Sequence, residues 1–270
     1  MSPASRITHH SSLTVATLNI LNDLARWPVR APLIVEELRA LQPDLIALQE
    51  VALPDNNAQW IADQLGGYSV HLSPKTGHKR QYEALAILSR LPVEAHDTLP
   101  LIHQDRVAQR VTVRHGPTRW VFANAHLYWN PIDDVTRLGQ TRRILDWLPR
   151  HTPTIVCGDF NAEPHTISIA AMRQRFASAH EAVHGREPDY TCPTPLHRGP
   201  GPRHSVRRAA IRLLGLITRR SDAWRGTLDY IFVDPAIRVQ HCAVAFHRPA
   251  PHDRRIYPSD HLGLTATLQL

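Results

Sequence analysis

Short apolar runs rich in β-branched residues recur along the chain, and they constrain its fold more than any other feature. Residues 13–20 (LTVATLNI) and 154–157 (TIVC) are typical, because they are too short for an ordinary helix and apolar enough for buried strands. Between such runs lie segments with apolar residues at helical spacing, as in 28–41 and 134–148. Strands that alternate with amphipathic helices predict an α/β protein in which helices cover the sheet.

The same patterns predict the other elements. Strands are expected at 45–48, 68–72, 84–88, 106–114, 119–127, 227–233, 239–246 and 262–270, and helices at 57–65 and about 166–176. The chain has no repeat of fixed period and no linker that divides it, so one domain is expected to span residues 1–270. A basic insert rich in proline and arginine is expected to interrupt this domain at about residues 180–226.

The insert has two parts. Residues 184–201 are rich in Pro, Gly and His and predict an irregular loop, whereas residues 205–220 (SVRRAAIRLLGLITRR) predict a helix with one basic and one apolar face. Nine arginines between residues 180 and 225, offset by four acids, carry +5 of the net charge of +7. Such a helix suits a nucleic-acid backbone or an anionic membrane surface. It can equally pack against the body with a solvated basic face.

Composition excludes several classes of protein. Three cysteines (Cys157, Cys192 and Cys242) are too few for a disulfide framework, which favours a reduced, cytoplasmic setting. The first apolar stretch is interrupted by Thr14, Thr17 and Asn19, unlike a signal peptide. No run reaches the roughly 20 apolar residues that cross a bilayer. The basic balance favours anionic partners, and a monomer is expected.

Polar side chains lie where the apolar strands end, and these are the candidate functional residues: Asn19, Glu50, His126, Asp159, Asn161, Asp229, Asp260 and His261. The ends of layered strands can meet at one rim, where ligands usually bind. Oxygen ligands without cysteine suit Mg²⁺ or Mn²⁺ rather than zinc. Because Mg²⁺ usually completes its coordination with water and substrate phosphate, this set points to phosphate-ester chemistry.

Each of these residues also has an ordinary structural explanation. Asn19 can be a turn residue, Asp260 a cap, His126 a hydrogen-bonded core histidine, and Asp229 the partner of an arginine. Glu50 is the hardest to explain in this way, because an apolar run leads up to it and burying an unpaired carboxylate is costly. The functional interpretation depends on the coincidence of all these residues.

Seven segments, in order, resemble the successive motifs of the endonuclease/exonuclease/phosphatase superfamily. They are TLNIL, PDLIALQEV, ALAILSR, NAHLYWNP, VCGDFNAEP, TLDYIFVD and YPSDH, and they run from residue 17 to residue 261. The resemblance implies a four-layer α/β sandwich, in which two mixed β-sheets pack face to face with helices outside. It also implies a metal-dependent hydrolase of phosphate esters, a nuclease or phosphatase.

The resemblance further implies how a metal would be held. Glu50 would be the principal ligand of Mg²⁺, or of Mn²⁺ as a substitute, with Asn19 beside it and Asp260 completing the metal or water network. Some nuclease branches have a second acid two residues after this asparagine, whereas this chain has Leu21. Glu83 is either a further polar contact at the rim or a solvated side chain. The resemblance leaves open whether one or two metals operate.

Roles for the remaining residues come from the same resemblance. Asp159 would orient or deprotonate the attacking water, and Asn161 would hold the water or a phosphate oxygen. Asp229 would fix the tautomer of His261 and favour its protonated form, while His126 would bind a non-bridging phosphate oxygen. The identity of the general base stays open.

The substrate is the least determined property. The segment HLYWNP, followed by Arg137, is similar to a segment of the poly(A)-removing exoribonucleases. Tyr128 and Trp129 can stack on a base and Arg137 can meet a phosphate, although Trp129 can also be a core residue. A phosphodiesterase acting on nucleic acid is therefore the first hypothesis. The second is a phosphoesterase acting on a small or lipid-borne phosphate, of the inositol phosphate or sphingomyelin type. A catalytically silent binding protein is disfavoured, because every candidate acid and histidine is present.

Overall fold

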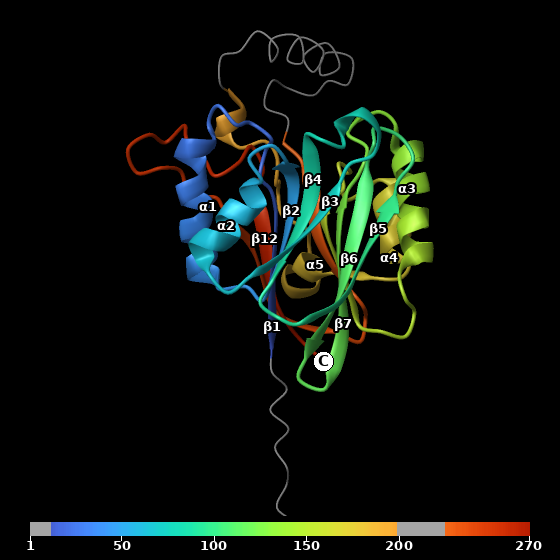
Figure 1. Ribbon diagram of the computed structural model, residues 1–270. Coiled ribbons are helices and arrows are strands. Elements are labelled where there is room, and N and C mark those ends of the chain that lie inside the picture. The colour runs from blue at the N-terminus through green and yellow to red at the C-terminus, as the bar shows by residue number, and fades with distance from the viewer. Residues whose placement is uncertain (1–11, 199–224) are drawn as a thin grey trace, which may run out of the picture.

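The computed structural model describes residues 12–198 and 225–270. Two six-stranded mixed sheets pack face to face, with α1 and α2 outside one sheet and α3 and α4 outside the other (Figure 1). This is the four-layer α/β sandwich predicted from the sequence. Among the described residues, no helix is both long enough and apolar enough to cross a membrane.

The first sheet has the strand order β11-β12-β1-β2-β4-β3. Its strands are β1 (Leu13–Asn19), β2 (Leu45–Ala52), β3 (Ser69–Pro74), β4 (Glu83–Ser89), β11 (Arg238–Ala245) and β12 (Gly263–Gln269). Strands β1 and β2 are parallel, and all other neighbours are antiparallel. The end of β1 and the beginning of β12 therefore lie at the same edge of the sheet.

The second sheet has the order β5-β6-β7-β8-β10-β9. Its strands are β5 (Val93–Pro100), β6 (Val107–His115), β7 (Thr118–His126), β8 (Thr154–Asp159), β9 (Ala177–Ser178) and β10 (Asp229–Val233). Strands β7 and β8 are parallel, and β10 runs antiparallel to β8. The ends of β7 and β8 consequently lie beside the beginning of β10.

Helices cover the outer faces of both sheets. They are α1 (Trp27–Leu41) and α2 (Asn57–Leu65) on the first sheet, and α3 (Asp134–Trp147) and α4 (Ile167–Arg173) on the second. Helix α5 (Ala179–His184) instead contacts β11 of the first sheet and β10 of the second, and short 3₁₀ turns lie at Gly77–Lys79 and Pro195–Arg198. Apolar residues fill three layers: one between the sheets and one between each sheet and its helices. The central strands are buried on both faces, which explains why they are continuously apolar in the sequence.

The structure adds three elements to those predicted. Strand β5 was not predicted. It is an edge strand whose side chains are mostly exposed, so its sequence has no apolar pattern. Strand β9 and helix α5 are too short to produce a periodic signal. The loop predicted at 184–201 is irregular as far as residue 194 and then forms the second 3₁₀ turn, whereas the helix predicted at 205–220 lies outside the described residues.

Candidate active site

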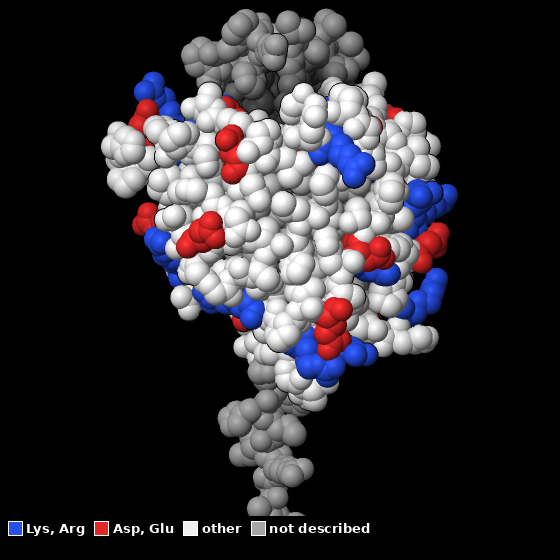
Figure 2. Space-filling model, viewed as in Figure 1, with Lys and Arg blue, Asp and Glu red and all other residues white. Residues whose placement is uncertain are grey.

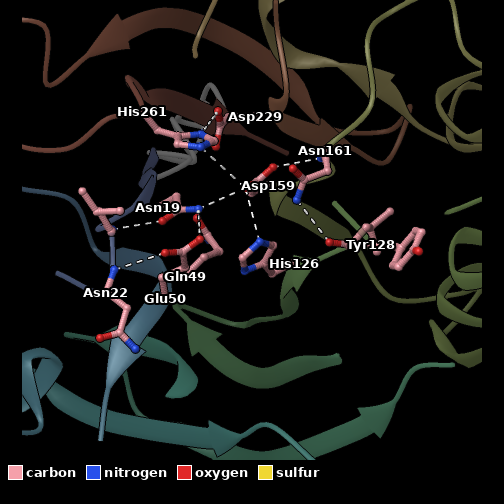
Figure 3. Close-up of polar contacts among 12 residues, drawn as sticks. Asn19, Asn22, Gln49, Glu50, His126, Tyr128, Asp159, Asn161, Asp229 and His261 are labelled. Atoms are coloured by element: carbon pink, nitrogen blue, oxygen red, sulfur yellow. Dashed lines mark hydrogen bonds and ion pairs between the residues drawn. The ribbon is translucent and has the colours of Figure 1, made fainter. Parts of the chain in front are cut away.

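The candidate residues converge at one edge shared by the two sheets (Figure 3). Asn19 ends β1, His126 ends β7 and Asp159 ends β8. Asp229 begins β10 directly opposite Asp159 in the antiparallel register, and His261 lies two residues before β12. A single rim thus brings together the last residues of β1, β7 and β8 and the first residue of β10, as predicted from the sequence.

Glu50 reaches this rim by a different route from the one expected. It does not end its strand, because β2 continues to Ala52. Instead, the register with β4 shifts between Leu48 and Val51, and Glu50 has a left-handed φ of 59°. Such a bulge redirects a side chain out of the regular alternation. The Glu50 carboxylate accepts hydrogen bonds from the Asn19 amide (3.2 Å) and from the backbone N–H of Asn22 (3.1 Å).

Asp159 lies at the centre of the cluster and is 1% exposed. Its Oδ1 accepts a hydrogen bond from the backbone N–H of Asn161 (2.9 Å), and its Oδ2 accepts one from the Asn19 amide (3.0 Å). The Nε2 atoms of His126 and His261 lie 3.4 and 3.9 Å from the same Oδ2. One carboxylate oxygen therefore faces an amide and two imidazoles.

Burial separates the acid–base properties of these groups. It raises the pKa of Asp159 to about 6, because the ionised carboxylate is removed from water. It also lowers the pKa of His126 well below 6.5, and the positive charges of Arg106 and Lys75 act in the same direction. At neutral pH, Asp159 is therefore ionised and His126 is neutral.

His261 has the opposite character. Its Nδ1 lies 2.9 Å from Oδ2 of Asp229, whose backbone N–H is in turn bonded to the Thr191 hydroxyl. Burial works against the charged imidazole, but Cys192, Asp229 and Asp159 raise the pKa of His261 well above 6.5. His261 is therefore a cation at neutral pH that directs its Nε2–H toward Asp159.

Two groups of residues here could hold a metal. Asp159, Asp229 and His261 each offer an atom within 4.8 Å of the others. However, a protonated imidazole is no ligand, and its Asp229 partner is already engaged. Glu50 and Asp159 offer carboxylate oxygens on either side of the Asn19 amide nitrogen, and hard oxygens of this kind fit Mg²⁺ better. The side-chain oxygen of Asn19 accepts a hydrogen bond from the backbone N–H of Leu21 (3.0 Å).

Asp260 belongs to the same neighbourhood. It is 8% exposed, and the Ser259 hydroxyl lies between its carboxylate (3.4 Å) and the backbone carbonyl of Asn19. The position is compatible with the metal or water network that the resemblance implies.

Comparison with known proteins identifies the family. The sequence matches the profile described as "Endonuclease/Exonuclease/phosphatase family" over residues 16–261, which is most of the chain. The chain belongs to this family.

Family relatives share both sequence and fold with the chain. Nocturnin from Rattus norvegicus is 27% identical over 265 residues, covering 88% of this chain and 58% of that protein. Protein angel homolog 2 from Mus musculus is 29% identical over 161 residues, covering 51% and 29%. The chain thus spans under a third of the length of that relative. The solved human Nocturnin catalytic domain with bound sulfate has a TM-score of 0.74 at 25% identity, covering 96% of this chain and 94% of that one.

One further solved member of this fold, from Danio rerio, is TDP2 complexed with single-stranded DNA product. It has a TM-score of 0.76 at 18% identity and covers 96% of this chain and all of that one. The four-layer fold is therefore common to proteins that differ from this chain at most positions.

Three residues were predicted to bind substrate, and they differ in their exposure and in the hydrogen bonds that they form. Tyr128 is half-buried and Trp129 is 47% exposed, and both lie on the loop that follows His126. Arg137 is 1% exposed, and its guanidinium donates to Asp134 and to the backbone carbonyls of Tyr128 and Asn130. The expected phosphate contact of Arg137 is therefore wrong, because its donors hold this loop in place.

Two buried amides beside the site were missed from the sequence. Gln49 donates to Oδ1 of Asn124 (2.7 Å) and to the Thr17 hydroxyl (3.1 Å), while Asn124 donates to the carbonyls of Leu48 and Ala86 (3.0 Å each). The pair connects the sheets next to Glu50 and two residues before His126. Amides inside apolar runs were the available signal, since buried polar groups require partners.

Three charged residues beside the rim were also missed or left undecided. Lys75 is 4% exposed and forms an ion pair with Glu83, which is therefore buried rather than solvated. Arg106 is 6% exposed and directly precedes β6. No sequence signal identifies Lys75 or Arg106, because a single cation next to a predicted strand is usually solvated.

Proposed function

We propose that the protein is a Mg²⁺-dependent phosphodiesterase that hydrolyses phosphate ester bonds of nucleic acid. The observation that carries this proposal is the convergence of Glu50, Asn19, Asp159 and two histidines, one neutral and one protonated, at one rim. Membership of the family supports a hydrolase of phosphate esters. Mn²⁺ is the natural substitute, since the donors are hard oxygens.

The acid–base states assign roles during attack by water. Ionised Asp159 accepts hydrogen bonds on both oxygens and has capacity left to orient a water and accept its proton. His261 is unsuited to act as the base because it is already protonated. Its Nε2–H instead stabilises negative charge on the phosphoryl oxygens as the new P–O bond forms and the ester bond breaks.

Two other residues bind rather than transfer protons. Neutral His126 faces an ionised carboxylate, so its Nε2 carries the proton, which can be shared with a phosphate oxygen. The side chain of Asn161 donates to the Leu127 carbonyl (3.1 Å), which leaves its oxygen toward water or substrate. A bound Mg²⁺ would be held by Glu50 with Asn19, Asp159 and Asp260 nearby, and would supply Lewis-acid stabilisation of phosphoryl charge.

Nucleic acid is the preferred substrate because aromatic side chains lie on the loop after His126. Exposed Trp129 and half-buried Tyr128 offer stacking surfaces for bases, each worth about 1–3 kcal/mol. On the face shown in Figure 2, basic and acidic side chains of the described residues are interspersed, so this face has no basic stripe for a phosphate backbone. We therefore propose that the nucleic-acid strand binds at the rim. We also propose that the enzyme is a cytoplasmic monomer.

A hydrolysis screen tests this proposal. Single-stranded RNA, single-stranded DNA, inositol phosphates and sphingomyelin vesicles are incubated with Mg²⁺ or Mn²⁺, using wild type, Asp159→Asn and Asp146→Asn. We expect nucleic acid to be cleaved and Asp159→Asn to lose about 10²–10⁴-fold in rate, the usual cost of removing a general base. Asp146 lies exposed on α3, so its variant should match wild type.

The outcomes separate the alternatives. Turnover of sphingomyelin or inositol phosphate alone would replace nucleic acid with a lipid-borne or small substrate. Nucleic-acid affinity should fall steeply with added salt. Binding releases counterions from the nucleic acid, and added salt opposes this release. The absence of any metal-dependent turnover would contradict the enzyme proposal, and wild-type rates in Asp159→Asn would contradict the site.

A further inference from the structure

Arg106 differs from the other buried arginines of the described region. Arg30 and Arg137 are at most 1% exposed, and the terminal nitrogens of both donate to backbone carbonyls. Arg106 is 6% exposed, yet its Nε and Nη1 have no hydrogen-bond partner. Leaving donors of a buried charged group unbonded is costly, so a ligand that accepts hydrogen bonds from them would stabilise this arrangement.

Two loops fix Arg106 beside Lys75. The backbone N–H of Thr76 donates to the carbonyl of Asp105 (3.0 Å), so the residue after Lys75 is bonded to the residue before Arg106. The Asp105 carboxylate occupies the space next to Gly77, where a Cβ would lie 2.3 Å from Oδ1. Two cations are consequently brought together at one position of the rim.

The loop that leads to Arg106 is strained. His103, Gln104 and Asp105 all have left-handed φ angles, of 70°, 52° and 56°. Non-glycine residues adopt this conformation at a cost and are concentrated at functional sites. Three such residues directly precede Arg106, which indicates that the position of its side chain is under functional constraint.

Only one of these two cations has an ion-pair partner in the described part of the chain. Glu83 forms an ion pair with Lys75, whereas the described residues provide no ion pair for Arg106. Burial, together with the charge of Arg106, lowers the pKa of Lys75 to about 8 despite its carboxylate partner. Arg106 therefore has no direct counter-ion among the described residues, and its unbonded donors are suited to an anion.

The charge of Arg106 faces the catalytic centre. The carboxylates that interact with Arg106 are those of Glu83, Glu50 and Asp159, and its charge helps to keep His126 neutral. Glu50 and Asp159 would be largely neutralised by a bound divalent ion. An anion bound in this centre could then accept hydrogen bonds from the unbonded N–H groups of Arg106.

We propose that Arg106 is a catalytic residue that binds a non-bridging oxygen of the substrate phosphoryl group, and that the Lys75–Glu83 ion pair positions it. The inference rests on the proposed phosphoesterase function. It adds to His126, Asn161 and His261 a guanidinium, which can bond two phosphate oxygens at once.

Binding of inorganic phosphate tests this role without requiring turnover. Isothermal titration calorimetry in saturating Mg²⁺ compares wild type with Arg106→Met, Arg106→Lys and the matched control Arg114→Met. Arg114 is on β6, the strand that Arg106 directly precedes; it is exposed and pairs with Glu94. We expect Arg106→Met to weaken phosphate binding by about 10- to 100-fold, as for a lost hydrogen bond to a charged group. Arg106→Lys should weaken it by a smaller factor, and Arg114→Met should bind like wild type.

The kinetic consequence is measured on any substrate that the screen identifies. Loss of Arg106 should lower kcat/KM by about 10²-fold, which is typical of one transition-state donor. Far-UV circular dichroism and thermal melting establish that each variant is folded. If Arg106→Met does not fold, Arg106→Lys decides the question, because it keeps the charge and loses the planar fork.

Failure of this inference is distinguishable from failure of the proposed function. Wild-type protein that binds no phosphate, or a folded Arg106 variant that binds it with unchanged affinity, would overturn the role of Arg106. Phosphate binding that depends on Arg106, in a protein that hydrolyses none of the substrates, would support the subsite and contradict the proposed function.

Discussion

At the scale of residues, two imidazoles at one carboxylate are held in different protonation states. His126 is buried near Lys75 and Arg106 and is neutral, whereas His261 is bonded to Asp229 and is charged. Environments that separate the pKa values of neighbouring groups distinguish donors from acceptors in active sites. A protonated His261 leaves Asp159, with its pKa of about 6, as the group able to accept a proton at neutral pH.

The Asp229–His261 pair predicts a pH-dependent contribution to stability. Because the folded pKa of His261 is raised above 6.5, its contribution is complete below pH 6.5 and disappears as the pH rises through the folded value. Asp229→Asn should therefore lower the free energy of unfolding by about 1.5–3 kcal/mol at pH 6, and by less at pH values above the folded pKa. Urea denaturation of metal-free protein across this range measures the difference. A loss that is independent of pH would show that His261 is not charged in the fold.

At the scale of elements, the sequence predicts strands better than it predicts their irregularities. Continuous apolar runs located the central strands and the rim residues Asn19, His126 and Asp159, because both faces of these strands are buried. The bulge at Glu50 left no signal, since it arises from pairing with β4 rather than from local composition. Arg137 was misassigned for a related reason: its partners are backbone carbonyls of a loop, which no side-chain pattern reveals.

Strands β7 and β8 approach each other closely at Gly158, so one added methyl group at this position should lower stability and activity. A Cβ on Gly158 would lie 2.0 Å from the carbonyl oxygen of Ala125, and Gly158 has a φ of 137°. Gly158→Ala should thus separate the strand ends that carry Asp159 and His126, costing more than about 2 kcal/mol of stability together with activity.

Gly139→Ala is the matched control for this prediction. Its Cβ would meet no atom within 4 Å, and it lies inside α3, so the change should stabilise the protein by about 0.5–1 kcal/mol. Thermal melts and hydrolysis rates of both variants provide the measurement. Equal stability of Gly158→Ala and wild type would mean that the two strands are not in this close contact.

At the scale of the whole molecule, the site joins the two sheets. Asn19 and Glu50 come from the first sheet and Asp159 from the second, and a single amide nitrogen of Asn19 bonds to both carboxylates. The neighbouring Gln49–Asn124 bridge also crosses between the sheets. A ligand bound here contacts both halves of the sandwich, so it should stabilise the entire fold rather than one loop.

This arrangement predicts that Mg²⁺ raises the thermal stability of the protein. At a concentration about 100-fold above its dissociation constant, an ion that binds only the folded state contributes about 2.7 kcal/mol. For a protein of this size, that corresponds to a rise in Tm of roughly 5–10 °C. Differential scanning calorimetry with Mg²⁺ and with EDTA measures the shift. Glu50→Gln should abolish most of the response because the principal carboxylate ligand is lost, whereas Glu94→Gln, at an ion pair with Arg114 and Arg119, should retain it. A full response in Glu50→Gln would place the ion elsewhere, with Asp159, Asp229 and His261 as the next group to vary.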